Sequence, residues 1–243
     1  MTQGRREVTL RVASSRRSAR VFGVLLLTAA VSASHAQTPP AAGERAHYTG
    51  LLAAASRGDA QAIEALTARG ERPDARDAHG RTSLHVAAYG RHHQAMRALV
   101  AAGADPNALE NDRYDIVTIA AVANDVPTLE MALALGASAK NVTSRYDGTA
   151  LIAAAHLGHA DVVRTLIRAG APLDHVNNLG WTALIESIVL GDGGPRHTDT
   201  LGALVDAGAN VNLADRNGQT PLALARARGY GAMVRRLLQA GAR

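Results

Sequence analysis

The chain contains no cysteine, and only seven of its 243 residues are aromatic: five Tyr, one Trp and one Phe. The absence of cysteine excludes disulfides, thiol chemistry and a lipoprotein anchor, and it is compatible with both an oxidising compartment and the cytosol. So few aromatic rings, in a chain rich in alanine, fit an architecture of thin packed layers. The composition therefore points away from one thick globular core.

A long apolar run is also missing. The best candidate, residues 21–33, is too short for a good membrane span. It follows six arginines in the first 20 residues and leads into small residues, which is the order of a secretory signal peptide. We therefore predict a signal peptide over residues 1–36, cleaved after Ala36, with membrane contact only during export. An uncleaved anchor and a twin-arginine export signal are the alternatives.

The positive charge of the chain belongs to this leader. It holds six of the 26 basic residues and one of the 21 acidic residues, while the formal net charge of the whole chain is +5. The remaining segment is neutral, so the basic footprint expected of a nucleic-acid-binding protein is absent. Composition and leader together predict a bacterial, periplasmic protein. Residues 37–46 are predicted to be a short disordered linker.

Six glycines recur at a nearly constant interval, each after a helical apolar run. A period of about 33 residues indicates a stack of identical supersecondary units rather than a single globular core. One such unit cannot bury its apolar faces alone, so its neighbours must cover them. The glycines are separated by 33, 33, 34, 38 and 33 residues: Gly70, Gly103, Gly136, Gly170, Gly208 and Gly241.

The repeated units share short motifs as well as glycines. Residues 80–88 read Gly-Arg-Thr-Ser-Leu-His-Val-Ala-Ala, residues 103–107 read Gly-Ala-Asp-Pro-Asn, and residues 218–222 read Gly-Gln-Thr-Pro-Leu. These motifs resemble ankyrin repeats, whose consensus has G-x-T-P-L-H-x-A-A and later G-A-D-x-N. The resemblance covers roughly residues 47–243 and is carried by six aligned units.

The resemblance implies an all-α ankyrin-repeat solenoid of about six helix-turn-helix units with short β-hairpin fingers, preceded by the signal peptide. It also implies a non-catalytic protein-binding module that needs no cofactor. The first and last units are expected to act as caps. The predicted domain spans residues 47–243, with units at about 47–76, 77–109, 110–143, 144–176, 177–214 and 215–243.

The predicted fingers carry the bulkiest side chains that are not needed for the repeat. Tyr, Trp and Arg are enriched at interface hot spots, and their gathering on consecutive fingers is informative in a chain with so few aromatics. Packing against the neighbouring finger is the alternative role for Trp181. We predict partner binding by Arg113, Tyr114, Arg145, Tyr146 and Trp181.

The concave groove is the second predicted surface. Tyr89 and His156 occupy the same position in the first helices of different units, and Glu186 replaces an apolar residue found at its position in other units. We expect His156 and Glu186 to lie close together and to offer a polar contact to a partner. An acid–base pair is the less favoured alternative.

The fifth unit has five extra residues, which explains its 38-residue spacing. They fall within residues 191–198, where two glycines followed by a proline favour a tight turn over a helix extension. Insertions in repeats map to loops on one face and are often functional. Arg196 and His197 are therefore candidate partner contacts, with a neutral surface insertion as the alternative.

These features together predict a monomeric, non-catalytic scaffold or adaptor that grips a protein of unknown identity. The main alternative is a small-ligand or glycan receptor, which requires a closed pocket near Trp181, His156 and Glu186. A hydrolase ranks third, because no recognisable catalytic set is present. No metal site is predicted, since the pair His92-His93 lacks further ligands at metal-binding spacing.

Overall fold

The structure is a computed structural model that describes residues 37–243, so the predicted signal peptide lies outside the described residues. This part of the chain is helical and contains no strand, and none of its helices is long and apolar enough to cross a membrane. The helices are α1 (Ala42–His47), α2 (Gly50–Arg57), α3 (Ala60–Ala68), α4 (Ser83–Tyr89), α5 (His93–Ala101), α6 (Ile116–Val122), α7 (Val126–Ala134), α8 (Ala150–Leu157), α9 (Ala160–Arg168), α10 (Ala183–Val189), α11 (Pro195–Asp206), α12 (Pro221–Ala227) and α13 (Gly231–Gln239).

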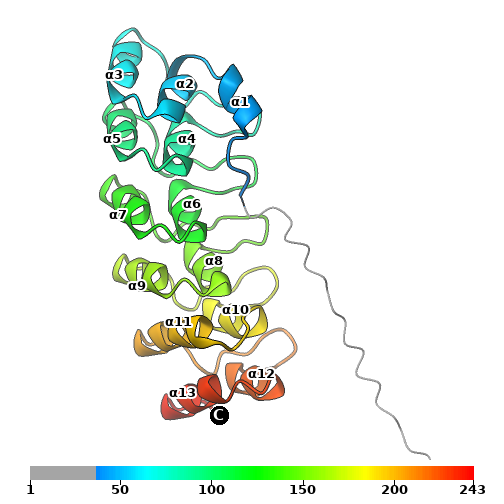
Figure 1. The fold of residues 1–243 in the computed structure, drawn as a ribbon. Coiled ribbons are helices and arrows are strands. Elements are labelled where there is room, and N and C mark those ends of the chain that lie inside the picture. The colour runs from blue at the N-terminus through cyan, green and yellow to red at the C-terminus, as the bar shows by residue number, and fades with distance from the viewer. Residues whose placement is uncertain (1–36) are drawn as a thin grey trace, which may run out of the picture. The chain divides into compact units, whose positions relative to one another are not determined.

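After α1, the helices form six pairs that stack in two rows (Figure 1). The even-numbered helices α2 to α12 make an inner row, and the odd-numbered helices α3 to α13 make an outer row. Each helix packs on its partner and on the equivalent helix of the next pair. The predicted all-helical solenoid is therefore confirmed.

The inner helices begin at side chains that cap them. In five of these helices, a side-chain oxygen of the residue before the first turn accepts a hydrogen bond from the backbone N–H three residues later. Such a cap satisfies one of the N–H groups that the helix itself leaves free. The capping residues are Thr82, Asp115, Thr149, Thr182 and Thr220.

The outer helices end at the six periodic glycines. All six have φ between 79° and 95°, a left-handed conformation that glycine adopts without a steric penalty. Small residues such as Ala87, Ala121 and Ala155 are completely buried in the inner row, which lets neighbouring pairs approach closely. The repeat period thus arises because every unit needs a left-handed glycine after its outer helix.

The fingers between units are hydrogen-bonded turns and not the predicted β-hairpins. Within residues 37–243, antiparallel pairing is limited to two isolated bridges, Arg76 with Thr82 and Thr143 with Gly148. Side chains replace the missing ladder in several tips. The Asn177 Oδ1 atom, for example, accepts from the backbone N–H groups of Leu179 and Trp181 at 3.0 Å each. Such side-chain turns suit Asp and Asn, which hydrogen-bond their own backbone two residues on.

Residues 37–46 are ordered and do not form the predicted linker. They end in α1, and Arg81 holds the stretch before it. The Arg81 guanidinium, only 1% exposed, donates to the Thr38 carbonyl at 2.9 Å and to the Glu44 carboxylate at 2.7 Å. It also bonds Asp77 at 2.7 Å. The composition of residues 37–46 is typical of a linker. The segment is nevertheless fixed in place, because the buried Arg81 guanidinium requires its hydrogen-bond acceptors.

Candidate functional site

Exposed apolar side chains gather on the two fingers that lead into the fourth and fifth helix pairs, namely the turns between α7 and α8 and between α9 and α10. Five large hydrophobic residues are exposed in the described part of the chain, and four lie on these two fingers. The fifth, Leu238, lies on α13. Contiguous exposed apolar surface marks interaction sites more often than isolated residues do. We call the four residues the fingertip patch: Val142 (38% exposed), Tyr146 (48%), Val176 (46%) and Leu179 (41%).

The two fingers are tied together by hydrogen bonds. The Asn178 backbone N–H donates to the Tyr146 carbonyl at 2.9 Å, and its side-chain amide donates to the Arg145 carbonyl at 3.0 Å. His175 Nε2 lies 2.6 Å from the Asp147 carbonyl oxygen. These hydrogen bonds fix the backbone beneath the fingertip patch. Little free energy would therefore be lost in ordering the two fingers when a partner binds.

Both predicted finger arginines are paired across fingers. Arg113 Nη1 lies 3.0 Å from Asp147 Oδ1, and Arg145 Nη2 lies 2.8 Å from Asp112 Oδ1. The two arginine side chains are 48% and 63% exposed, so solvent screens both pairs and each contributes little to stability. The arginines brace the third and fourth fingers while staying accessible to a partner.

The predicted tyrosines of the second and third units are partly covered. Tyr89 and Tyr114 are half-buried, and burial raises the pKa of each phenol. Tyr89 lines a cavity of about 250 Å³ that is bounded on one side by Gln37 and Pro39. The chain's own N-terminal segment therefore lies against this part of the groove.

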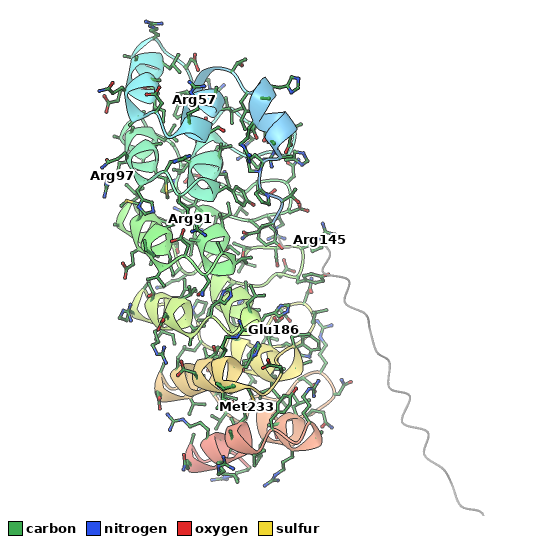
Figure 2. The ribbon with its side chains drawn as sticks, viewed as in Figure 1. Arg57, Arg91, Arg97, Arg145, Glu186 and Met233 are labelled. Carbon is green, nitrogen blue, oxygen red and sulfur yellow. The ribbon has the colours of Figure 1, made fainter. Side chains whose placement is uncertain are left out.

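The structure brings Glu186 of α10, labelled in Figure 2, close to His156 of α8. His156 Nδ1 lies 3.8 Å from Glu186 Oε2, which is longer than a hydrogen bond. The Asn177 side-chain amide donates to Glu186 Oε1 at 2.8 Å, and Asn177 Oδ1 accepts from the Trp181 backbone N–H. The carboxyl group is thus connected to the finger that carries the only tryptophan.

Burial controls the charge of this pair. Glu186 is 5% exposed, and its burial raises the pKa of the carboxyl to about 7, against the opposing hydrogen bond from Asn177. Burial also lowers the pKa of His156, with a smaller contribution from the positive charge of His197. Desolvation disfavours the charged form of each group, so burial works against an ion pair across the 3.8 Å contact.

The insertion in the fifth unit is a helix extension as well as a turn, which corrects the prediction. α11 has 12 residues, whereas the other outer helices have nine. Pro195 occupies its first turn, where a missing N–H costs nothing. The Gly-Gly-Pro sequence therefore marks a helix start, and Arg196 is exposed on the first turn.

His197 is buried and packs within the fold, so it is not the exposed partner contact that the sequence predicted. It is 6% exposed; its Nδ1 lies 2.8 Å from Asp192 Oδ1, and its Nε2 lies 2.9 Å from the His156 carbonyl oxygen. Both ring nitrogens therefore lie within hydrogen-bond distance of an oxygen atom. The Asp192 N–H, at 3.5 Å from Nδ1, is the more distant neighbour. His197 thereby fastens the insertion to the end of α8.

A further cavity lies away from the predicted groove residues. A cavity of about 670 Å³ lies along the outer helices, lined by Arg164, Asp199 and Arg236 among others. Neither this cavity nor the one beside Tyr89 includes Trp181, His156 or Glu186. In the same described range, no group of three or more His, Asp or Glu side chains is arranged to hold a metal ion.

Sequence reasoning missed most of the fingertip patch. Leu179 stands three residues before the capping Thr182, as Tyr146 stands three residues before Thr149. Adjacent units present equivalent positions side by side, so this shared register was the signal that could have revealed the patch. Asn177, which orients both Glu186 and the Trp181 backbone, was also missed, because its role depends on contacts outside its own turn.

Comparison with known proteins agrees with this architecture. A family model described as "Ankyrin repeats (3 copies)" matches residues 13–110 and 117–215. The chain is 32% identical over 192 residues to the putative ankyrin repeat protein YahD of Escherichia coli (strain K12), covering 79% of this chain and 95% of that protein. It is 30% identical over 132 residues to the ankyrin repeat and KH domain-containing protein mask-1 of Caenorhabditis elegans, a match that covers 54% of this chain but only 5% of that protein.

Solved structures show the same stack. An ankyrin repeat domain from Acinetobacter baumannii AYE is 46% identical, with a TM-score of 0.74 over 79% of this chain and 98% of that one. The ankyrin repeat domain of Bcl-3, a member of the IkappaB family, is 28% identical, with a TM-score of 0.72 over 81% and 88%. With six stacked helix pairs, a family model that matches most of its length and these relatives, the chain belongs to the ankyrin repeat family.

Proposed function

We propose that this chain is a non-catalytic scaffold that binds one partner protein through the fingers and groove of its fourth and fifth units. Ankyrin repeat domains generally mediate protein–protein interaction. The observation that carries the proposal is the fingertip patch, because four of the five exposed large apolar side chains in residues 37–243 gather there. The equivalent tip positions of the second, third and sixth units are polar: His79, Asp112 and Asn217.

The patch has the composition expected of a binding hot spot. Tyr146 lies within it, and Trp181, which is partly exposed, follows Leu179 on the same finger. Aromatic side chains of this kind dominate interface energetics when neighbouring residues exclude water around them. A standard interface buries roughly 800 Å² on each partner, so the partner is expected to contact the adjoining inner helices as well as the two fingers.

A crosslinker on the patch is expected to capture one specific protein in intact cells. Leu179 and Leu238 offer a matched pair of positions for a photoreactive amino acid, because they are 41% and 46% exposed and lie on different surfaces. We expect one protein to crosslink from position 179 and not from 238, as mass spectrometry of the adducts will show. Tyr146→Ala should weaken binding of that purified protein about thirtyfold, or about 2 kcal/mol.

The control for this experiment is stability. Tyr146 is half-exposed, so its replacement by alanine should change the free energy of unfolding by less than about 0.5 kcal/mol. Equal crosslinking from positions 179 and 238, or a partner that binds Tyr146→Ala as tightly as the wild-type chain, contradicts the proposal.

We also propose that the protein is exported to the periplasm of a bacterium. The basic, apolar and small-residue order of residues 1–36 supports this, as does the similarity to proteins of Escherichia coli and Acinetobacter baumannii. We expect the chain recovered from the periplasmic fraction to begin at Gln37 by N-terminal sequencing. A chain that retains Met1 in the cytosolic fraction contradicts export, and one that retains Met1 in the membrane supports the anchor alternative.

A further inference from the structure

One oxygen of the Glu186 carboxyl accepts no hydrogen bond from the described chain. Oε1 accepts the hydrogen bond from Asn177, whereas Oε2 accepts no hydrogen bond from any described residue and has only the 3.8 Å contact with His156 Nδ1. Glu186 Oε2 is not among the fully buried side-chain atoms that lack a hydrogen-bond partner, so a donor from outside the chain can reach it. A ligand that donates to Oε2 would add a charge-assisted hydrogen bond that the chain itself does not make.

Another buried carboxyl in the same solenoid shows the contrast. Asp115 is 1% exposed, and both its oxygens are occupied within the chain. Its Oδ1 accepts from the backbone N–H and the hydroxyl of Thr118, and its Oδ2 accepts from the Asn141 amide. The fold therefore satisfies a structural carboxyl completely in the third unit, but leaves Glu186 incomplete in the fifth unit.

The second unit shows that one guanidinium can satisfy two carboxylates at once. Arg81, one residue before the capping Thr82, places its guanidinium against Asp77 and Glu44. In the fifth unit the residue before the capping threonine is Trp181, so no arginine of the chain stands at that position. The position of Glu186 corresponds to the apolar Val86 of the second unit, and no arginine in residues 37–243 pairs with the Glu186 carboxylate.

The surroundings of Glu186 favour a guanidinium in particular. His156, whose side chain is 41% exposed, lies at the open side of the pair. As the neutral imidazole it carries no charge that would repel a cation, and its Nδ1 is free to act as an acceptor when Nε2 holds the proton. Two acceptors 3.8 Å apart match the neighbouring N–H groups of a planar guanidinium.

We infer that Glu186 and His156 form a groove subsite that receives an arginine side chain of the partner protein, while apolar residues beside that arginine lie on the fingertip patch. The inference rests on the proposed function and names the chemistry of the partner segment. The first part of the groove is less accessible, because the chain's own Gln37 and Pro39 line the cavity beside Tyr89.

The subsite can be tested with N-acetyl-arginine methylamide, a probe that needs no knowledge of the partner. Its uncharged counterpart, N-acetyl-citrulline methylamide, is a near-isosteric control. We expect the arginine probe to shift the ¹³C signal of the Glu186 carboxyl saturably, in the millimolar range, and the citrulline probe to bind at least about tenfold more weakly. Glu186→Gln, which keeps the acceptor for Asn177, should abolish this difference, whereas Glu130→Gln on exposed surface should leave it unchanged.

Binding of the arginine probe should also depend on pH. Since the pKa of Glu186 is about 7, affinity should rise about tenfold from about pH 6 to pH 8 as the carboxylate forms. Besides Glu186 and His156 themselves, the charged or titratable groups around the pair are His197 on α11 and Arg228 after α12, whose guanidinium donates to the Val189 carbonyl. Fluorescence of Trp181, the only tryptophan, provides an independent readout.

The outcomes separate this inference from the proposed function. Equal binding of the two probes, or an unperturbed Glu186 signal at saturating concentration, overturns the arginine subsite even when crosslinking from position 179 succeeds. Tighter binding of the corresponding lysine compound overturns the guanidinium assignment. Loss of crosslinking together with intact arginine binding contradicts the proposed function and leaves the subsite standing.

Discussion

Replacing Arg81 with methionine is expected to lower the free energy of unfolding by about 3 kcal/mol, because it breaks a buried charge network. The guanidinium is 1% exposed and bonds two carboxylates and one backbone carbonyl. Methionine fills similar space but donates no hydrogen bond. Asp77 would keep only its hydrogen bond from the Tyr48 hydroxyl and those from the backbone N–H groups of its own turn.

Urea unfolding followed by circular dichroism at neutral pH measures this loss. Arg97→Met is the matched control, because Arg97 is an exposed arginine on α5 and its replacement should cost less than about 0.5 kcal/mol (Figure 2). Amide hydrogen exchange should also accelerate across residues 38–47 in Arg81→Met alone, since Thr38 and Glu44 lose their anchor. A variant as stable as the wild-type chain, with unchanged exchange, contradicts this role for Arg81.

The free energy of unfolding of Glu186→Gln, measured relative to that of the wild-type chain, is expected to rise with pH. Across the whole titration of Glu186 the rise should be about 3 kcal/mol. The pKa of Glu186 is raised from 4.5 to about 7 by burial. A folded carboxyl with a raised pKa contributes its stability below the unfolded pKa and loses that contribution as the pH rises through the folded pKa. The wild-type chain therefore weakens as the pH rises from about 4.5 through about 7, and glutamine has no such proton to lose.

The measurement is the difference in unfolding free energy between the two chains at about pH 5 and at about pH 8. Taking the difference removes the other titrating groups, such as Asp77, Glu44 and Asp192, each of which has a lowered pKa and changes stability in the opposite direction. A difference that does not vary with pH would show that Glu186 is hydrated in the folded protein.

The repeat architecture was predictable because its signals are local. Each unit needs a capping residue before its inner helix and a left-handed glycine after its outer helix, and both are visible in the order of residues. The meeting of His156 and Glu186 could also be predicted from the sequence. Stacked units place equivalent positions side by side, so aligning the repeats is enough to bring these two side chains onto neighbouring helices.

The predictions that were wrong fall into two kinds. Some depended on contacts between residues far apart in the sequence, and others on a composition that is compatible with two different local structures. Residues 37–46 were predicted to be disordered from their composition, yet Arg81 binds them. The insertion before α11 was predicted to be a turn, yet its proline begins a helix. His197 was predicted to face a partner, yet it is buried against Asp192 and the end of α8.

The sequence by itself determined the helix pairs, their number and their stacking, because capping, glycine conformation and apolar spacing act within a few residues of one another. Only the tertiary structure decided which polar groups are satisfied and which remain open. The unbonded Glu186 Oε2, the paired finger arginines and the exposed fingertip patch all depend on neighbours contributed by other units or by the N-terminal segment. Burial and hydrogen bonding are properties of such assembled neighbours, so no single stretch of sequence specifies them.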